Sequence, residues 1–181
     1  MANKKHYIIT SITLGIIAAS SALLIGLTHA LTIDQINKNE ANRVNEGIHK
    51  IYGDSAYIFK DETAKEAGLE GKYLNFVYTV KNDMDEQLGY AFRTTGSNTY
   101  GKISLIIGFD EISHGFKGLS VVVNEQTYAS TLVKNYIDPL NDGDINPDDV
   151  SCGATYGATL INNMIKQAND AALKLWGIGN E

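Results

Sequence analysis

The sequence predicts an α+β protein in which an N-terminal transmembrane helix precedes one antiparallel-sheet domain packed with helices. Three observations support this fold class. The chain opens with a long uncharged apolar run, continues with several segments rich in aromatic and β-branched residues, and closes with a helical repeat of apolar positions. Strands in series followed by helices are typical of the α+β arrangement.

The composition bounds the class of protein further. The chain has 181 residues, of which 44% are hydrophobic, and its seventeen glycines follow no period. Such a chain can bury a core and is neither disordered nor a repeat protein. The formal net charge is -6, and no basic cluster stands out. Nucleic acid is therefore not an expected partner.

The apolar run from Tyr7 to Ile33 carries no Lys, Arg, Asp or Glu. A helix needs about 20 apolar residues to cross a bilayer, so this run is long enough. Lys4 and Lys5 precede it and Asp34 follows, and the positive-inside rule then places the N-terminus in the cytoplasm. We expect a single-pass protein of the cell membrane, with residues 1–30 as cytoplasmic N-terminus and signal anchor. Residues 31–181 would form an extracytoplasmic domain; cleavage after Ala30 remains an alternative.

A second helix is expected to begin at Thr32, where Gln35 three residues later completes a capping box. Its apolar positions recur at near-helical spacing, and Gly53 is a common helix terminator. The apolar stripe, expected to face the core, comprises Ile33, Ile36, Ala41, Val44, Ile48 and Ile51.

Four strand-like runs follow, and the turns between them favour an antiparallel sheet. The runs are residues 72–80, 88–96, 102–110 and 116–126, with turns at 81–87 and 111–115. Residues 128–137 indicate a short helix. The last helix carries a face with i, i+3, i+4, i+7 spacing that should lie on the sheet. That face consists of Ile161, Met164, Ile165, Ala168, Ala172 and Leu175.

The triplet Gly-Ala-Thr occurs twice just before this last helix, at 153–155 and 157–159. A helix start presents unpaired N–H groups and a positive dipole end, and glycines let a phosphate approach the backbone closely. A phosphate could bind there or be bonded as an ester to a threonine. The alternative is structural, with Thr155 or Thr159 capping the helix and the glycines serving as turn residues.

The run Asp149-Val150-Ser151-Cys152-Gly153-Ala154-Thr155 resembles the flavin-attachment motif of the membrane-anchored FMN-binding domain family. This family includes the G subunit of the Rnf electron-transport complex and the C subunit of the sodium-pumping NADH:quinone reductase. Residues 99–127 are similar to the family's core segment, and residues 31–48 are similar to its start. Cys152 departs from the usual Ser or Thr, and Tyr156-Gly157-Ala158 departs from the usual continuation.

The resemblance implies that a flavin transferase links the phosphate of FMN to Thr155, giving a threonyl FMN phosphoester. The cofactor-binding residues that it implies are Thr155, Gly153, Ala154, Cys152, Asp149, Tyr156, Glu125 and Thr127. Thr159 is a lesser alternative, because no acidic residue stands six positions before it as Asp149 stands before Thr155.

The function implied by the resemblance is electron transfer. The chain would be an electron-carrier subunit of an Rnf-like ion-translocating complex, not a stand-alone enzyme, with other membrane subunits and the lipid bilayer as partners. Two alternatives stay open. The chain could be a stand-alone exported FMN carrier that serves extracellular acceptors, or a membrane-anchored binding module without cofactor.

Metal binding has weaker support. Residues 138–149 have the length of a calcium loop, but Leu140 occupies the third ligand position, so we interpret the segment as an acidic surface turn. The histidines lack metal-ligand spacing. The lone cysteine, Cys152, is interpreted as a small buried hydrophobe. No metal ligand and no catalytic residue is therefore predicted.

Overall fold

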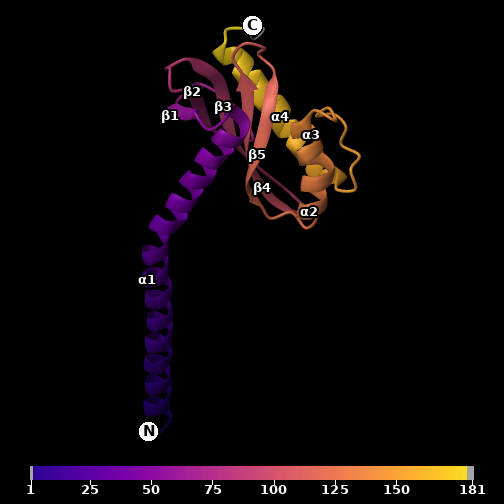
Figure 1. The fold of residues 1–181 in the computed structure, drawn as a ribbon. Coiled ribbons are helices and arrows are strands. Elements are labelled where there is room, and N and C mark those ends of the chain that lie inside the picture. Colours follow the sequence, from indigo (N-terminus) through magenta and orange to yellow (C-terminus); the bar gives the residue numbers. More distant parts are fainter. Residues whose placement is uncertain (1, 179–181) are drawn as a thin grey trace. The chain divides into compact units, whose positions relative to one another are not determined.

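The computed structural model describes residues 2–178 and divides the chain into two compact units, residues 1–42 and 43–181. Helix α1 (Ala2–Tyr52) begins in the first unit and ends in the second (Figure 1). The second unit then contains five strands and a set of helices. In chain order the strands are β1 (Tyr57–Thr63), β2 (Leu74–Lys81), β3 (Gln87–Asn98), β4 (Gly101–Asp110) and β5 (Phe116–Asn124). The helices that follow are α2 (Ala129–Leu132), the π-helix η1 (Val133–Ile137), α3 (Asp138–Asp142) and α4 (Thr155–Leu175).

The five strands form one antiparallel sheet in the order β1-β2-β3-β4-β5. The α+β class, the antiparallel sheet and the four predicted strands are confirmed. Strand β1 was missed. Its sequence, YIFKDET, carries three charged residues and lies at the sheet edge, largely outside the core, so it has no clear apolar alternation.

Helix α4 covers one face of the sheet (Figure 1), as the helical repeat predicted. The apolar face of α4 packs on β2, β3 and β4, and helices α2 and α3 extend the same layer, with α3 against β5. Among the largest fully buried side chains of this layer are Phe92, Leu105, Ile107, Phe109, Leu119, Leu132, Tyr136 and Ile161. The layer fixes the start of α4 against the sheet and against α2.

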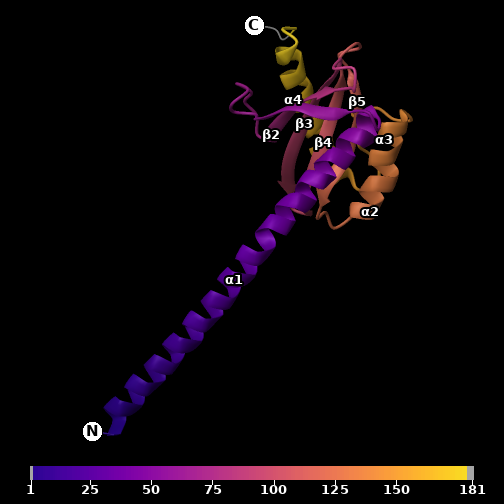
Figure 2. The ribbon, with the colours of Figure 1, turned by 60° about the vertical axis from the view of Figure 1, so that its left-hand side comes forward.

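The last turns of α1, from Arg43 onward, cover the opposite face (Figure 2). Val44 and Ile48 are buried there, and Arg43 donates a hydrogen bond from Nη1 to the carbonyl of Val122 at 2.8 Å. At the helix end, the Tyr52 hydroxyl lies 2.8 Å from the Tyr90 carbonyl and accepts a 3.0 Å hydrogen bond from the Phe109 amide. These contacts attach the end of α1 to the central strands.

The predicted helix start at Thr32 is wrong, because α1 is continuous through this position. The Thr32 hydroxyl donates to the Thr28 carbonyl at 2.8 Å. A side-chain cap is needed only where backbone N–H groups lack partners, and here the preceding turn supplies their acceptors. The predicted end at Gly53 is confirmed: Gly53 has φ +98°, and its amide donates to the His49 carbonyl at 2.8 Å.

The predicted helix at 128–137 is present but longer, since α2 passes through η1 into α3. Pro139 stands at the start of α3, directly after the π-helix η1. The helix therefore takes up the first part of the acidic segment 138–149, and Gly143 ends it with φ +79°.

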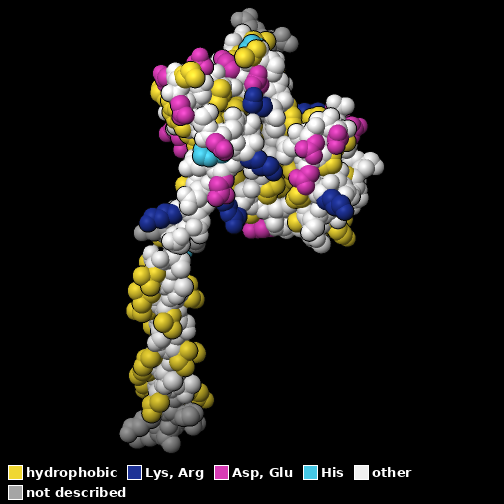
Figure 3. Space-filling view, viewed as in Figure 1, with side chains coloured by type: hydrophobic (Ala, Val, Ile, Leu, Met, Phe, Trp, Pro, Cys, Tyr) yellow, Lys and Arg dark blue, Asp and Glu magenta, His cyan; other side chains and the backbone are white. Residues whose placement is uncertain are grey.

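Within the first unit, the apolar part of α1 is long and hydrophobic enough to cross a membrane. In Figure 3, hydrophobic side chains are spread along this stretch, with white atoms between them. This supports a single-pass membrane protein.

Candidate functional site

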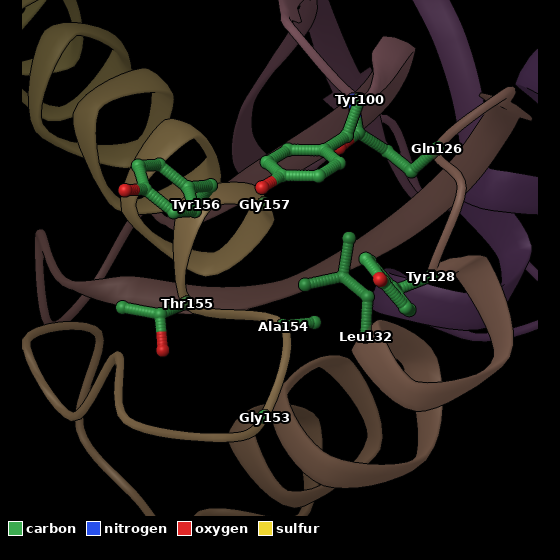
Figure 4. Close-up of a pocket in the computed structure, with 9 residues that line it drawn as sticks. All are labelled: Tyr100, Gln126, Tyr128, Leu132, Gly153, Ala154, Thr155, Tyr156 and Gly157. Carbon is green, nitrogen blue, oxygen red and sulfur yellow. The ribbon is translucent and has the colours of Figure 1, made fainter.

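The repeated Gly-Ala-Thr triplet, at residues 153–155 and 157–159, lies beside a pocket of about 260 Å³ (Figure 4). The pocket is built from four parts of the second unit: the turn between β3 and β4, the segment after β5, helix α2 and the start of α4. Its lining consists of Tyr100, Gln126, Tyr128, Leu132, Gly153, Ala154, Thr155, Tyr156 and Gly157. None of these side chains is charged.

Thr155 is the first residue of α4, and Ala154 is the N-cap without a side-chain hydrogen bond. The structural alternative, in which Thr155 or Thr159 caps this helix, is therefore wrong. The Thr155 side chain is exposed, and its hydroxyl forms no hydrogen bond with any described residue. Gly153, with φ +79°, turns the chain into the helix. The arrangement leaves the secondary hydroxyl of Thr155 free at a helix start.

The loop before this segment is held at several points. Tyr136, whose pKa is raised by burial, donates from its hydroxyl to the carbonyl of Pro147. Asp148 accepts hydrogen bonds from Lys166 at 2.7 Å and from Asn162 at 2.9 Å, and these bonds lower the pKa of its carboxyl. The loop is thus tied both to η1 and to α4.

The second part of the site is the close approach of Gly101 to the end of β5. Gly101 has φ +132°, and an ideal Cβ there would lie 2.1 Å from the carbonyl oxygen of Glu125. Next to it, Thr127 donates from both its amide and its hydroxyl to the Tyr100 carbonyl, at 2.8 and 3.1 Å. Gln126 donates from its side chain to the Gly101 carbonyl. Only glycine at position 101 lets the backbones of these two segments come so close.

Four of the predicted cofactor residues line the pocket together: Gly153, Ala154, Thr155 and Tyr156. The other four lie outside its lining. Cys152 is half-buried against the core, and its carbonyl accepts a hydrogen bond from Asn135 at 3.1 Å. Asp149 is exposed and accepts from the Asn146 amide at 2.9 Å.

Glu125 and Thr127, the remaining two, are exposed and flank the lining residue Gln126. Glu125 meets the turn between β3 and β4 through its backbone, and Thr127 through both backbone and hydroxyl. They shape the pocket wall without lining it.

Sequence reasoning missed Tyr100, Gln126, Tyr128 and Leu132 as pocket residues. The ring of Tyr100 lies 5.4 Å from that of Tyr156 and 5.7 Å from that of Tyr128, between centroids. A signal was present for part of this set, because Tyr100 falls inside the segment 99–127 and Gln126 and Tyr128 adjoin Glu125 and Thr127. Nothing local pointed to Leu132.

Gly157 brings helix α4 close to α2 at the base of the pocket. It is buried, and an ideal Cβ at this position would lie 2.9 Å from Cδ2 of Leu132. A larger residue would have to displace Leu132. The second Gly-Ala-Thr therefore begins with a packing residue.

Among the residues whose side chains the structure describes, which leave out 1–6, 34, 36, 37 and 179–181, no group of three or more His, Cys, Asp or Glu could hold a metal ion. In the segment 138–149, Asp138 and Asp142 belong to α3, and the carboxylate of Asp149 accepts a hydrogen bond from the Asn146 amide in the same turn. The chemistry that this site offers is a free hydroxyl beside an uncharged, partly aromatic pocket.

The comparisons with known proteins bear on the other end of the chain. Residues 1–51 match the family model described as the RnfG N-terminal region. These first 51 residues are RnfG-like, and for this stretch the match supports a relation to Rnf-type electron-transport subunits. The matched part ends before the sheet, so it does not include the pocket. No curated protein matches the chain.

Proposed function

We propose that this RnfG-like chain is a membrane-anchored electron carrier with FMN in phosphoester linkage to Thr155. The observation that carries the proposal is the position of Thr155. Its exposed, unpaired hydroxyl stands at the first residue of α4, at the edge of the pocket. Two stretches that resemble the FMN-binding domain, residues 99–127 and 149–155, both contribute to this pocket. A hydroxyl engaged in capping would be less available for an ester bond.

The residues around Thr155 suit a phosphate. The first turn of α4 has N–H groups without helical acceptors, and the helix dipole favours negative charge at this end. Gly153 and Ala154 keep the approach free of large side chains. Bound flavin would supply the capacity to accept and donate electrons, and the chain would supply its position.

The N-terminal segment supports the membrane part of the proposal. We place the N-terminus in the cytoplasm, the apolar part of α1 in the membrane and residues 31–181 outside, because Lys4 and Lys5 precede the apolar run. An exported flavoprotein gains from a covalent bond, since cofactor lost outside the cell could not be recovered.

Chain length favours a membrane-bound redox partner over a distant acceptor. The chain enters the second unit at Arg43, which contacts Val122 near the end of β5 that leads into the pocket. Only residues 34–42 separate Arg43 from the apolar run. Even fully extended, such a segment spans no more than about 35 Å. The segment between the apolar run and the second unit is thus short, which favours a redox partner in the same membrane.

The decisive experiment is intact mass of the full chain, purified in mild detergent after co-expression with its flavin transferase. We expect the mass of the polypeptide plus one FMN, and flavin fluorescence that survives denaturing electrophoresis. Thr155→Val should lose both signals, and the matched variant Thr159→Val should keep them. A wild-type chain with only its polypeptide mass contradicts the proposal.

The place of the carrier in a complex needs a separate measurement. We expect polytopic membrane subunits to co-purify with the full chain from its native membrane. Flavinylated protein that purifies alone and reduces a soluble external acceptor would favour the stand-alone carrier instead.

A further inference from the structure

Three tyrosines form a cluster at the mouth of the pocket. Tyr100 lies between Tyr128 and Tyr156, with its ring tilted by 55° and 38° to theirs. Tyr128 is 53% exposed and Tyr156 is 69% exposed, although both have an aromatic neighbour. Figure 4 shows the rings of Tyr100 and Tyr156 beside each other, with Tyr128 near Leu132. Large aromatic rings gathered on a surface in this way mark a binding site for an apolar partner.

The pocket suits one flat ring system better than a complete nucleotide. Its volume of about 260 Å³ is below the roughly 300–1,000 Å³ of pockets that enclose a drug-sized ligand. Its lining has no charged side chain, so the groups that favour a phosphate are the free N–H groups at the start of α4, at the edge of the pocket. The exposed Thr155 hydroxyl stands at the rim, outside the tyrosine cluster (Figure 4). Phosphate and ring would thus have separate places.

One side chain fixes the geometry of this cluster. Asn98, at the end of β3, accepts a hydrogen bond from the Tyr100 amide at 2.8 Å and donates one to the Tyr156 carbonyl at 3.1 Å. It therefore joins the turn between β3 and β4 to the first turn of α4. The resemblance to known proteins gives this asparagine no role.

We propose that Tyr100, Tyr128 and Tyr156 form the surface on which the flavin ring stacks, and that Asn98 is the positioning residue that holds two of the rings in register. This inference rests on the proposed function, because it concerns the ring of the nucleotide attached at Thr155. Stacking on the tyrosines shields the ring from water and fixes its orientation for electron transfer.

Accessibility of the flavin ring tests the proposal. Iodide quenching of flavin fluorescence is measured on the full flavinylated chain, for wild type, Tyr156→Leu, Tyr128→Leu and Asn98→Ala. A lost aromatic contact should shift the ratio of shielded to free ring by about two- to tenfold, so the quenching constant should rise. Asn98→Asp, which keeps the acceptor for the Tyr100 amide, should fall between wild type and Asn98→Ala.

The matched control is Tyr57→Leu, a half-exposed tyrosine on β1 that does not line the pocket. It should quench like wild type, and all variants should carry one FMN by mass. Equal quenching constants in all flavinylated variants would overturn this inference and leave the proposed function standing. A wild-type chain without FMN overturns both.

Discussion

At the scale of single residues, the site depends on one threonine whose hydroxyl has no hydrogen bond and on two glycines that allow close packing. The hydroxyl of Thr155 is free because the N-cap of α4 is Ala154, so no threonine side chain caps the helix. Gly157 lets α4 approach Leu132, and Gly101 lets the turn between β3 and β4 approach Glu125. The chemistry and the walls of the pocket are therefore set by the absence of side-chain atoms as much as by their presence.

The prediction at this scale concerns Gly101→Ala. The backbone at φ +132° is one that alanine rarely adopts, and its Cβ would overlap the Glu125 carbonyl oxygen at 2.1 Å. We expect a loss of about 2–4 kcal/mol in the free energy of unfolding. The measurement is urea unfolding of the full chain in detergent, followed by the fluorescence of Trp176.

Gly68→Ala is the matched control, because Gly68 also has positive φ, +70°, but open space around it. Its cost should stay near 1 kcal/mol, the price of the backbone conformation alone. Equal losses in the two variants would mean that the close approach at Gly101 does not limit stability.

At the scale of elements, the turn between β4 and β5 is organised by one carboxylate. Asp110 accepts hydrogen bonds from Lys117 at 2.6 Å and from the amides of Ser113 and Ile112 at 3.0 and 3.2 Å. Mainly through the bond from Lys117, these contacts lower the pKa of Asp110 from 3.8 to about 2. The predicted turn at 111–115 is thus confirmed, and it is held by a set of exposed hydrogen bonds to Asp110 that the sequence did not reveal.

A stability change with pH follows from this turn. Because the folded-state pKa is depressed, the stabilisation is complete above pH 3.8 and is lost as the pH falls through about 2. Asp110→Asn should be less stable than wild type by about 1 kcal/mol at pH 7, after allowance for solvent screening. This difference should shrink between pH 4 and pH 2 in thermal unfolding. Asp170→Asn, at an exposed position, is the matched control for the substitution itself.

The elements also show how far the sequence could predict this molecule. Strands β2 to β5 and the buried face of α4 were predictable, because aromatic, β-branched and helically spaced apolar residues mark burial locally. The charged edge strand β1 and the continuity of α1 through Thr32 were not, because neighbouring elements decide them. In the site, the motif predicted Gly153 to Tyr156. The contact of Tyr100 with Tyr128 and Tyr156 arises only when the sheet folds.

At the scale of the whole molecule, the proposed function requires that residues 31–181 lie outside the cytoplasm. The apolar run precedes the second unit in the chain, so the side of the membrane reached by the second unit is set by the orientation of that run. Lys4 and Lys5 lie on its N-terminal side, and positive residues flanking a span stay in the cytoplasm.

Single cysteines test this orientation in intact cells. In a Cys152→Ser background, a cysteine replacing the exposed Glu70 should react with a membrane-impermeant maleimide. A cysteine replacing Asn3 should react only after lysis. The native Cys152 is half-buried and would be a poor reporter, which is why it is removed. Labelling of Asn3→Cys and protection of Glu70→Cys in intact cells would place the pocket in the cytoplasm. The argument for a covalent cofactor, based on its loss outside the cell, would then no longer apply.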